Sequence, residues 1–185
     1  MPAPTRAPCG AGSRRSTACP GTTPTNPIVR AVVRQRAADA CEYCLMPTTG
    51  KFEIEHIIPK QRWNDYLTGT YPGLRRAQRL ALSTPDHIAN FAWSCFFCNN
   101  AKGGRPRPRT DLRLFDPRFD QWPEHFAFSP TKGYGVIIGL TAIGAETVRA
   151  MRFHEGSPEG ALAERYAAIL RGIYPPPWLR AAYDL

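Results

Sequence analysis

Two pairs of cysteines, each separated by two residues, constrain the fold of this chain more than any other feature of its sequence. The pairs are Cys41-Glu-Tyr-Cys44 and Cys95-Phe-Phe-Cys98, with 50 residues between them. Each pair can place two thiolates on one metal ion, and the two pairs complete the closed tetrahedral set that zinc prefers in structural sites. Because a closed site has no open coordination position, it stabilises a fold and does not catalyse. The spacing therefore predicts one structural Zn²⁺ ion bound by all four cysteines.

Two other interpretations of these cysteines stay open. One pair would be a redox dithiol and the other incidental, although the second pair repeats the first and neither lies in a thioredoxin-like βαβ pattern. An iron–sulfur cluster uses the same four ligands. We favour zinc, because a structural zinc contributes on the order of 10 to 16 kcal/mol of apparent binding free energy, which decides whether a small core folds.

The length and the apolar patterning indicate a soluble, intracellular chain. Its 185 residues suit one domain with appendages. Apolar runs reach only about five residues, as at 136–140, which is too short for a transmembrane helix. The first residues lack the apolar stretch of a secretory signal. We therefore expect a cytoplasmic protein, in a compartment where closely spaced cysteines bind metal more often than they form disulfides.

The positive charge is concentrated in two stretches of the chain. The net charge is +9, and residues 1–40 hold six arginines against one acidic residue, while residues 101–118 hold six basic residues against two acidic ones. Clustered positive charge is the pattern expected for a partner rich in phosphate, so DNA is the expected partner and RNA is not excluded. Scattered arginines that only keep a surface hydrated are the plainer alternative.

Composition divides the chain into three parts. Residues 1–25 contain five prolines, three glycines and no Ile, Leu, Val, Phe, Trp or Tyr, which predicts a disordered tail. Cys9 and Cys19 lie in this tail without other ligands near them, and we interpret them as free thiols. Residues 26–110 form the expected zinc domain, and residues 111–185 an accessory segment.

The pattern of helix and strand signals predicts an α+β fold. Asn26-Pro27 is typical of a helix N-terminus, and Gly103-Gly104 of a helix end. The expected elements are a helix from residue 27 to about 40, strands at 51–59 and 90–94, a helical turn from 98, a short helix at 74–82, a hairpin at 126–140, and helices at 142–152 and 158–171.

Several side chains between and beside the cysteine pairs are suited to hydrolysis. Glu55 and His56 lie on the first expected strand, Asn90 begins the second, and Asn99 and Lys102 lie on the turn that follows. An ion that holds both cysteine pairs draws the strand toward this turn. Carboxylate and amide oxygens suit Mg²⁺ or Mn²⁺, and an imidazole takes a proton near neutral pH. Phosphodiester hydrolysis needs a metal and a base of this kind.

Taken together, these stretches resemble the HNH endonucleases, in their zinc-containing ββα-metal form. The stretches are CEYC at 41–44, FEIEHIIPK at 52–60 and NFAWSCFFCNNAKGG at 90–104. The combined pattern is specific, whereas each piece alone is weak. The resemblance implies a ββα-metal core after a first helix, followed by a small unit of a hairpin and helices.

The resemblance also implies a role for each of these residues. His56 is the general base, Glu55 and Asn99 are ligands of a catalytic Mg²⁺ or Mn²⁺ ion, Asn90 braces the loop that orients the base, and Lys102 approaches the phosphate. The implied activity is hydrolysis of DNA phosphodiester bonds. A monomer would nick one strand, and a homodimer would cut both.

This sequence departs from the family pattern at two points. Glu rather than Asp or His precedes the base, and its extra methylene changes the reach of the metal ligand. The connection from residue 61 to 88 is longer than the usual loop.

Three arginines separated by prolines follow the expected turn and are the best candidates for contacts with the DNA backbone: Arg105, Arg107 and Arg109. A simple linker explains them as well. Two other functions fit the same sequence. One is a zinc-stabilised nucleic-acid binding module without cleavage activity, and the other is a protein-interaction module.

Overall fold

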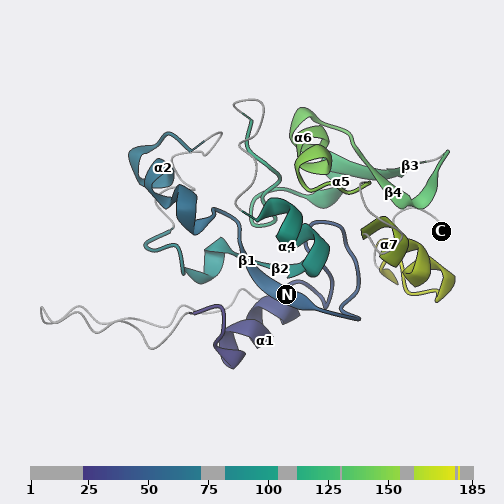
Figure 1. The fold of residues 1–185 in the computed structure, drawn as a ribbon, viewed down its shortest axis with the longest axis horizontal. Coiled ribbons are helices and arrows are strands. Elements are labelled where there is room, and N and C mark those ends of the chain that lie inside the picture. The colour runs from purple at the N-terminus through teal and green to yellow at the C-terminus, as the bar shows by residue number, and fades with distance from the viewer. Residues whose placement is uncertain are drawn as a thin grey trace, which may run out of the picture.

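Two separate antiparallel sheets, each of two strands, organise the fold (Figure 1). The computed structural model describes residues 23–71, 82–103, 112–129, 131–154, 161–177 and 179. In the first sheet β1 (Phe52–His56) pairs with β2 (Phe91–Cys95), and in the second β3 (Phe126–Ser129) pairs with β4 (Gly133–Gly139). This part of the chain is therefore α+β, as the sequence pattern predicted.

Helix α1 (Pro27–Arg36) begins where the sequence predicted and ends earlier. The side chain of Asn26 accepts a hydrogen bond from the backbone N–H of Ile28 at 2.9 Å and so caps the helix. The prediction that the helix continues to about Ala40 was wrong. Ala38 and Asp39 have φ values of 50° and 57°, in the left-handed region that ends a helix.

The first sheet leads directly into a helix. Strand β2 is buried along its whole length, and α4 (Phe96–Lys102) follows it with Cys95 as the N-cap residue. The cross-strand pairs run from Phe52 opposite Cys95 to His56 opposite Phe91. Helix α4 contacts both strands. Its start at Phe96, two residues before the predicted turn, places Asn99 and Lys102 on a regular helix beside β1.

The connection between β1 and β2 contains structure that the sequence pattern did not predict. The 3-10 helix η1 (Lys60–Arg62) leads into α2 (Trp63–Thr68), which ends at Gly69 with a φ of 78°, and the 3-10 helix η2 (Ile88–Asn90) precedes β2. The helix predicted at 74–82 lies, apart from its last residue, outside the described residues.

The second sheet is covered by α5 (Trp122–His125), α6 (Ala142–Ala150) and α7 (Ala161–Leu170). The predicted hairpin and the two predicted helices after it are confirmed. Two glycines allow α6 to approach the sheet closely. A Cβ atom on Gly139 would lie 2.2 Å from the backbone nitrogen of Ala145, and one on Gly144 would lie 2.1 Å from the carbonyl oxygen of His125.

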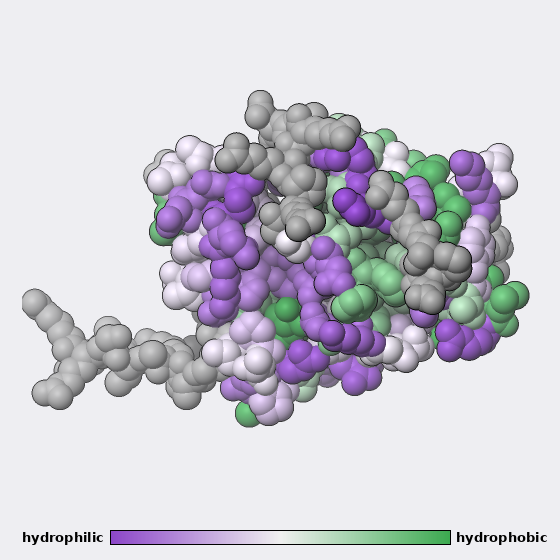
Figure 2. Space-filling model, viewed as in Figure 1, coloured by the Kyte–Doolittle hydropathy of each residue, from purple (hydrophilic) through white to green (hydrophobic). Residues whose placement is uncertain are grey.

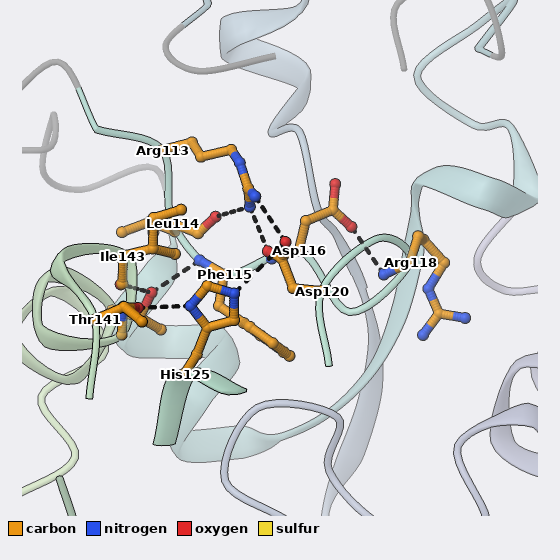
Figure 3. Close-up of polar contacts among 11 residues, drawn as sticks. Arg113, Leu114, Phe115, Asp116, Arg118, Asp120, His125, Thr141 and Ile143 are labelled. Atoms are coloured by element: carbon orange, nitrogen blue, oxygen red, sulfur yellow. Dashed lines mark hydrogen bonds and ion pairs between the residues drawn. The ribbon is translucent and has the colours of Figure 1, made fainter. Parts of the chain in front are cut away.

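A polar network ties the segment before α5 to α6 (Figure 3). Arg113 faces Asp120 and binds its carboxylate through both terminal nitrogens, one of them at 2.6 Å. The ring of His125 bonds the hydroxyl of Thr141 at 2.6 Å. The carboxylate of Asp116 accepts a hydrogen bond from the backbone N–H of Arg118 at 2.9 Å. These contacts fix the segment from residue 112 to the start of the second sheet.

One hydrophobic core runs through both predicted units. Its buried members include Val33 of α1, Trp93 of β2, Phe126 of β3 and Phe153 after α6. On the face shown in Figure 2, hydrophilic residues dominate the left side and more apolar residues gather on the right. None of the helices in the described part of the chain combines the length and the apolar character needed to cross a bilayer.

Candidate metal centre and active site

The four cysteines of the two C-x-x-C pairs form a buried cluster. Their sulfur atoms all lie within 4.8 Å of one another, and those of Cys44 and Cys95 are 3.7 Å apart. Four sulfurs at about 2.3 Å from one tetrahedral ion are about 3.8 Å apart, so the spacing suits zinc. Cys41, Cys44, Cys95 and Cys98 can therefore hold a metal ion such as zinc, as predicted.

The local backbone explains how each pair is presented. A tight turn follows the first pair, in which the N–H of Leu45 donates to the carbonyl of Cys41 at 2.8 Å and the N–H of Cys41 donates to the carbonyl of Met46 at 2.7 Å. The second pair begins at the last residue of β2 and ends in the first turn of α4. The cluster thus joins a turn after α1 to the point where strand becomes helix.

Electrostatics inside the cluster favours a bound cation. Hydrogen bonding, first from Cys41 and then from the other two thiols, holds the pKa of Cys44 well below its usual value. Hydrogen bonding with Cys41, and next with Cys44, raises the pKa of Cys95 and Cys98 well above the usual value of a thiol. One thiolate forms readily among neutral thiols, but further thiolates repel it in a buried site. A divalent cation removes that repulsion.

A pocket of about 280 Å³ between β1 and α4 brings together three of the predicted site residues. Its lining includes Glu55 and His56 of β1 and Asn99 of α4. Pro59, Lys60 and Gln61, which follow β1, form much of the remaining wall. Residues that are more than 40 positions apart in the sequence therefore meet here, because α4 contacts β1.

Two hydrogen bonds hold the carboxylate of Glu55, which is only 6% exposed. The hydroxyl of Tyr43 donates to Oε2 at 2.6 Å, and the ammonium of Lys102 binds Oε1. Burial, and next the nearby Glu55 charge, raise the pKa of Tyr43 well above its usual value, so its hydroxyl stays a donor. A carboxylate offers about four lone pairs, so two remain for other partners.

The structure places Lys102 away from solvent. The residue is 5% exposed, and besides Glu55 its ammonium donates to the backbone carbonyls of His56 and Ile57, each at 2.7 Å. These three bonds use all three ammonium protons. This arrangement favours a role in joining α4 to β1 over the phosphate contact that the sequence resemblance implied.

The imidazole of His56 is held by a carboxylate that sequence reasoning did not identify. Nε2 of His56 lies 2.8 Å from Oδ1 of Asp86, and the ring meets Phe91 edge-on with 5.1 Å between centroids. Burial alone would raise the pKa of Asp86, but hydrogen bonds from Lys60 and His56 outweigh it and lower that pKa. Asp86 lies 30 residues from His56 in a connection without a regular pattern, so no sequence signal indicated the pair.

A second missed carboxylate, Glu53, fixes the amide of Asn99. Nδ2 of Asn99 donates to Oε2 of Glu53 at 2.5 Å. Glu53 lies two residues before Glu55, and residues two apart on a strand share a face. That alternation could have indicated Glu53 from the sequence.

Asn90 joins the segment that follows His56 to the segment that precedes Asp86. Its Oδ1 accepts from the N–H of Ile58 at 2.8 Å, while its Nδ2 donates to the carbonyls of Ile58 at 3.0 Å and Pro85 at 2.9 Å. The side chain is 1% exposed, so these bonds are shielded from water. They also explain why β1 ends at His56 although the apolar pattern continues to Pro59.

Arg105, Arg107 and Arg109, the predicted contacts with DNA, lie outside the described residues, and their role stays a prediction. Within the part of the chain that the structure describes, the cysteines form the one group of three or more His, Cys, Asp or Glu side chains close enough to hold a metal ion. A comparison of the chain with protein-family models, with curated proteins and with solved structures gives no match.

Proposed function

We propose that the protein is a divalent-metal-dependent endonuclease of the HNH type that hydrolyses phosphodiester bonds in DNA. One observation carries this proposal. Glu55 and His56 of β1 and Asn99 of α4 line a single pocket, and a buried cluster of four cysteines lies where β2, the partner strand of β1, passes into α4. In this proposal β1, β2 and α4 form the ββα-metal core, and the cysteines hold structural zinc.

Two oxygens of the pocket suit the divalent ion that such an enzyme needs. Because Nδ2 of Asn99 is bound to Glu53, its Oδ1 is the amide atom left for a cation. Glu55 keeps lone pairs beyond its bonds to Tyr43 and Lys102. These two residues would hold Mg²⁺ or Mn²⁺, which supplies a Lewis acid for the charge on the phosphate and the departing oxygen.

His56 is the proposed base that accepts a proton from the attacking water. With Nε2–H donated to Asp86, the neutral ring leaves Nδ1 as the nitrogen that accepts a proton. The carboxylate of Asp86 then stabilises the imidazolium that forms, as an acidic partner does for a catalytic histidine elsewhere. Asn90 fixes the backbone immediately after the base.

Plasmid cleavage tests the proposal. Supercoiled DNA is incubated with the protein and Mg²⁺, Mn²⁺ or EDTA, beside the variants His56→Ala and His154→Ala. His154 is exposed and lies after α6, far along the chain from the pocket, so it serves as the matched control. We expect metal-dependent conversion to open-circular or linear DNA. His56→Ala should lower the rate by about 10²-fold or more, the usual contribution of a general base.

The alternative functions give other results in the same assay. DNA binding without cleavage by either the parent or His56→Ala would indicate a nucleic-acid binding module. Neither binding nor cleavage would indicate a protein-interaction module. Open-circular product alone indicates cleavage of one strand per encounter, as expected of a monomer.

A further inference from the structure

The first cysteine pair carries two residues between its thiols, and their side chains reach different parts of the molecule. Tyr43 donates its hydroxyl to Glu55 at 2.6 Å. Glu42 accepts from the N–H of Trp93 in β2 at 2.8 Å and forms an ion pair with Arg118. A turn of four residues therefore contacts the metal cluster, the proposed active site and the segment before α5.

Side chains from the C-terminal part of the chain hold the backbone of this turn. The indole of Trp122 donates to the carbonyl of Tyr43 at 2.9 Å, and the hydroxyl of Tyr174 donates to the carbonyl of Cys44 at 2.9 Å. Both donors are buried, with Trp122 at the start of α5 and Tyr174 after α7. The backbone of Tyr43 is therefore fixed from two sides, by its cysteine neighbours and by Trp122.

We propose that Tyr43 is a positioning residue of the proposed nuclease site, which orients the carboxylate of Glu55 toward the divalent ion. This inference rests on the proposed function. It also assigns a task to Trp122 and Tyr174, which hold the turn that carries Tyr43.

The geometry explains why Lys102 alone does not fix the orientation of the Glu55 carboxylate. Lys102 binds Oε1 and Tyr43 binds Oε2, so the two donors together fix the rotation of the carboxylate about its last bond. If one donor is removed, the carboxylate can rotate, and the ion loses a ligand that is already oriented for binding. Partners that orient metal ligands typically change metal affinity or activity by 10- to 100-fold when they are removed.

The test uses the zinc-loaded, full-length protein and its Tyr43→Phe variant. Mn²⁺ affinity is measured from the electron paramagnetic resonance signal of free Mn²⁺, and cleavage is measured as a function of Mn²⁺ concentration. Tyr66→Phe is the matched control, because Tyr66 is also a buried tyrosine and its hydroxyl contacts the carbonyl of Leu82. We expect Tyr43→Phe to keep zinc, to bind Mn²⁺ about 10-fold more weakly, and to need correspondingly more Mn²⁺ for half-maximal cleavage. Tyr66→Phe should match the parent in both.

A double-mutant cycle with Glu55→Gln separates positioning from a general structural effect. If Tyr43 acts through Glu55, then Tyr43→Phe changes Mn²⁺ affinity little when residue 55 is already Gln. Additive effects, loss of zinc from Tyr43→Phe, or unchanged Mn²⁺ affinity in a variant of an active parent would each overturn the inference. A parent that neither binds Mn²⁺ nor cleaves DNA would instead overturn the proposed function, and the inference with it.

Discussion

Around β1 and β2 the protein is held by four buried sulfurs and by charged side chains, whereas around β3 and β4 it is held by packed aromatic rings. The first region buries Glu55 and Lys102 as an ion pair beside the cysteine cluster. In the second region Phe126 lies at the centre of a ring cluster, with its centroid 5.0 Å from that of Phe115 and 5.3 Å from that of Trp122. We predict from this comparison that the first region depends on a bound ion for its stability and that the second depends mainly on burial of apolar surface.

The two regions are nevertheless joined. Trp122 belongs to the aromatic cluster and also donates to the turn of the first cysteine pair. We therefore predict that the two regions differ in how much stability they lose when their own stabilising groups are removed, although both belong to one cooperative structure. Substitutions made in each region test this prediction.

Removal of one of the four cysteines proposed to hold zinc should have the largest effect. Cys95→Ser takes away most of an apparent binding free energy on the order of 10 kcal/mol, which is comparable with the entire stability of a small protein. Hydrogen exchange should show loss of protection in β1 and β2 and greater protection remaining in β3 and β4. Cys9→Ser, outside the predicted ligand set, is the control. Equal loss of protection in both sheets would contradict the difference proposed between the regions.

Substitution of the buried lysine should have the next largest effect. Lys102→Met leaves the charge of Glu55 buried without its partner, which typically costs about 3 to 5 kcal/mol. Urea denaturation of the zinc-loaded protein measures this loss. The exposed Lys132 provides the control, because Lys132→Met should change stability by less than about 0.5 kcal/mol.

A second variant sharpens that prediction. Adding Glu55→Gln to Lys102→Met removes the unpaired charge and should restore much of the lost stability. If the double variant is as unstable as Lys102→Met, the loss comes from the carbonyl contacts of the lysine with His56 and Ile57 rather than from the charge of Glu55.

The smallest of these effects concerns Asp116 in the second region. Burial raises its pKa to about 6, above the usual value of an aspartate. The folded protein therefore binds more protons than the unfolded chain between about pH 4 and pH 6, and the contribution of Asp116 to stability falls as pH rises through this window. Asp116→Asn should be more stable than the parent above pH 6, by at most about 3 kcal/mol, and should match it below pH 4.

Asp120 should change the pH dependence of stability in the opposite direction, and it serves as the comparison. Burial alone would raise its pKa, but the hydrogen bond from Arg113 outweighs this and lowers it. Asp120→Asn should therefore lower stability near neutral pH, and the difference from the parent should shrink on acidification. Thermal denaturation from pH 2 to pH 8 measures both variants, because the window of Asp116 lies between about pH 4 and pH 6 and that of Asp120 lies below about pH 4. The same sign for both would contradict the electrostatic account.

Local sequence signals predicted both sheets, most of the longer helices and the cysteine cluster, because each depends on short-range chemistry, but they missed α2 and α5. Asn26 marked its helix through a side chain that caps the next turn, and the C-x-x-C spacing marked the cysteine cluster. Asp86 and Lys102 show what such local signals do not predict. Lysine is usually exposed, and nothing near Lys102 in sequence shows that Glu55 and two carbonyls will surround it. Such pairs form only after distant segments meet: α4 with β1 for Lys102, and the end of the β1–β2 connection with β1 for Asp86.

The connection between the two strands of the first sheet is a place where the chain can change in length over evolution. Its ends are fixed by the pairing of His56 with Phe91 and by the bonds of Asn90. Each doubling of a loop's length adds only about 0.6 kcal/mol of closure entropy, so residues can be gained or lost here over evolution at little cost to the fold. Lys60 and Asp86 lie near the two ends of this connection and pair with each other beside the pocket. In the proposed nuclease, variation in its length would therefore alter the surface next to the pocket while Glu55, His56 and Asn99 stay in place.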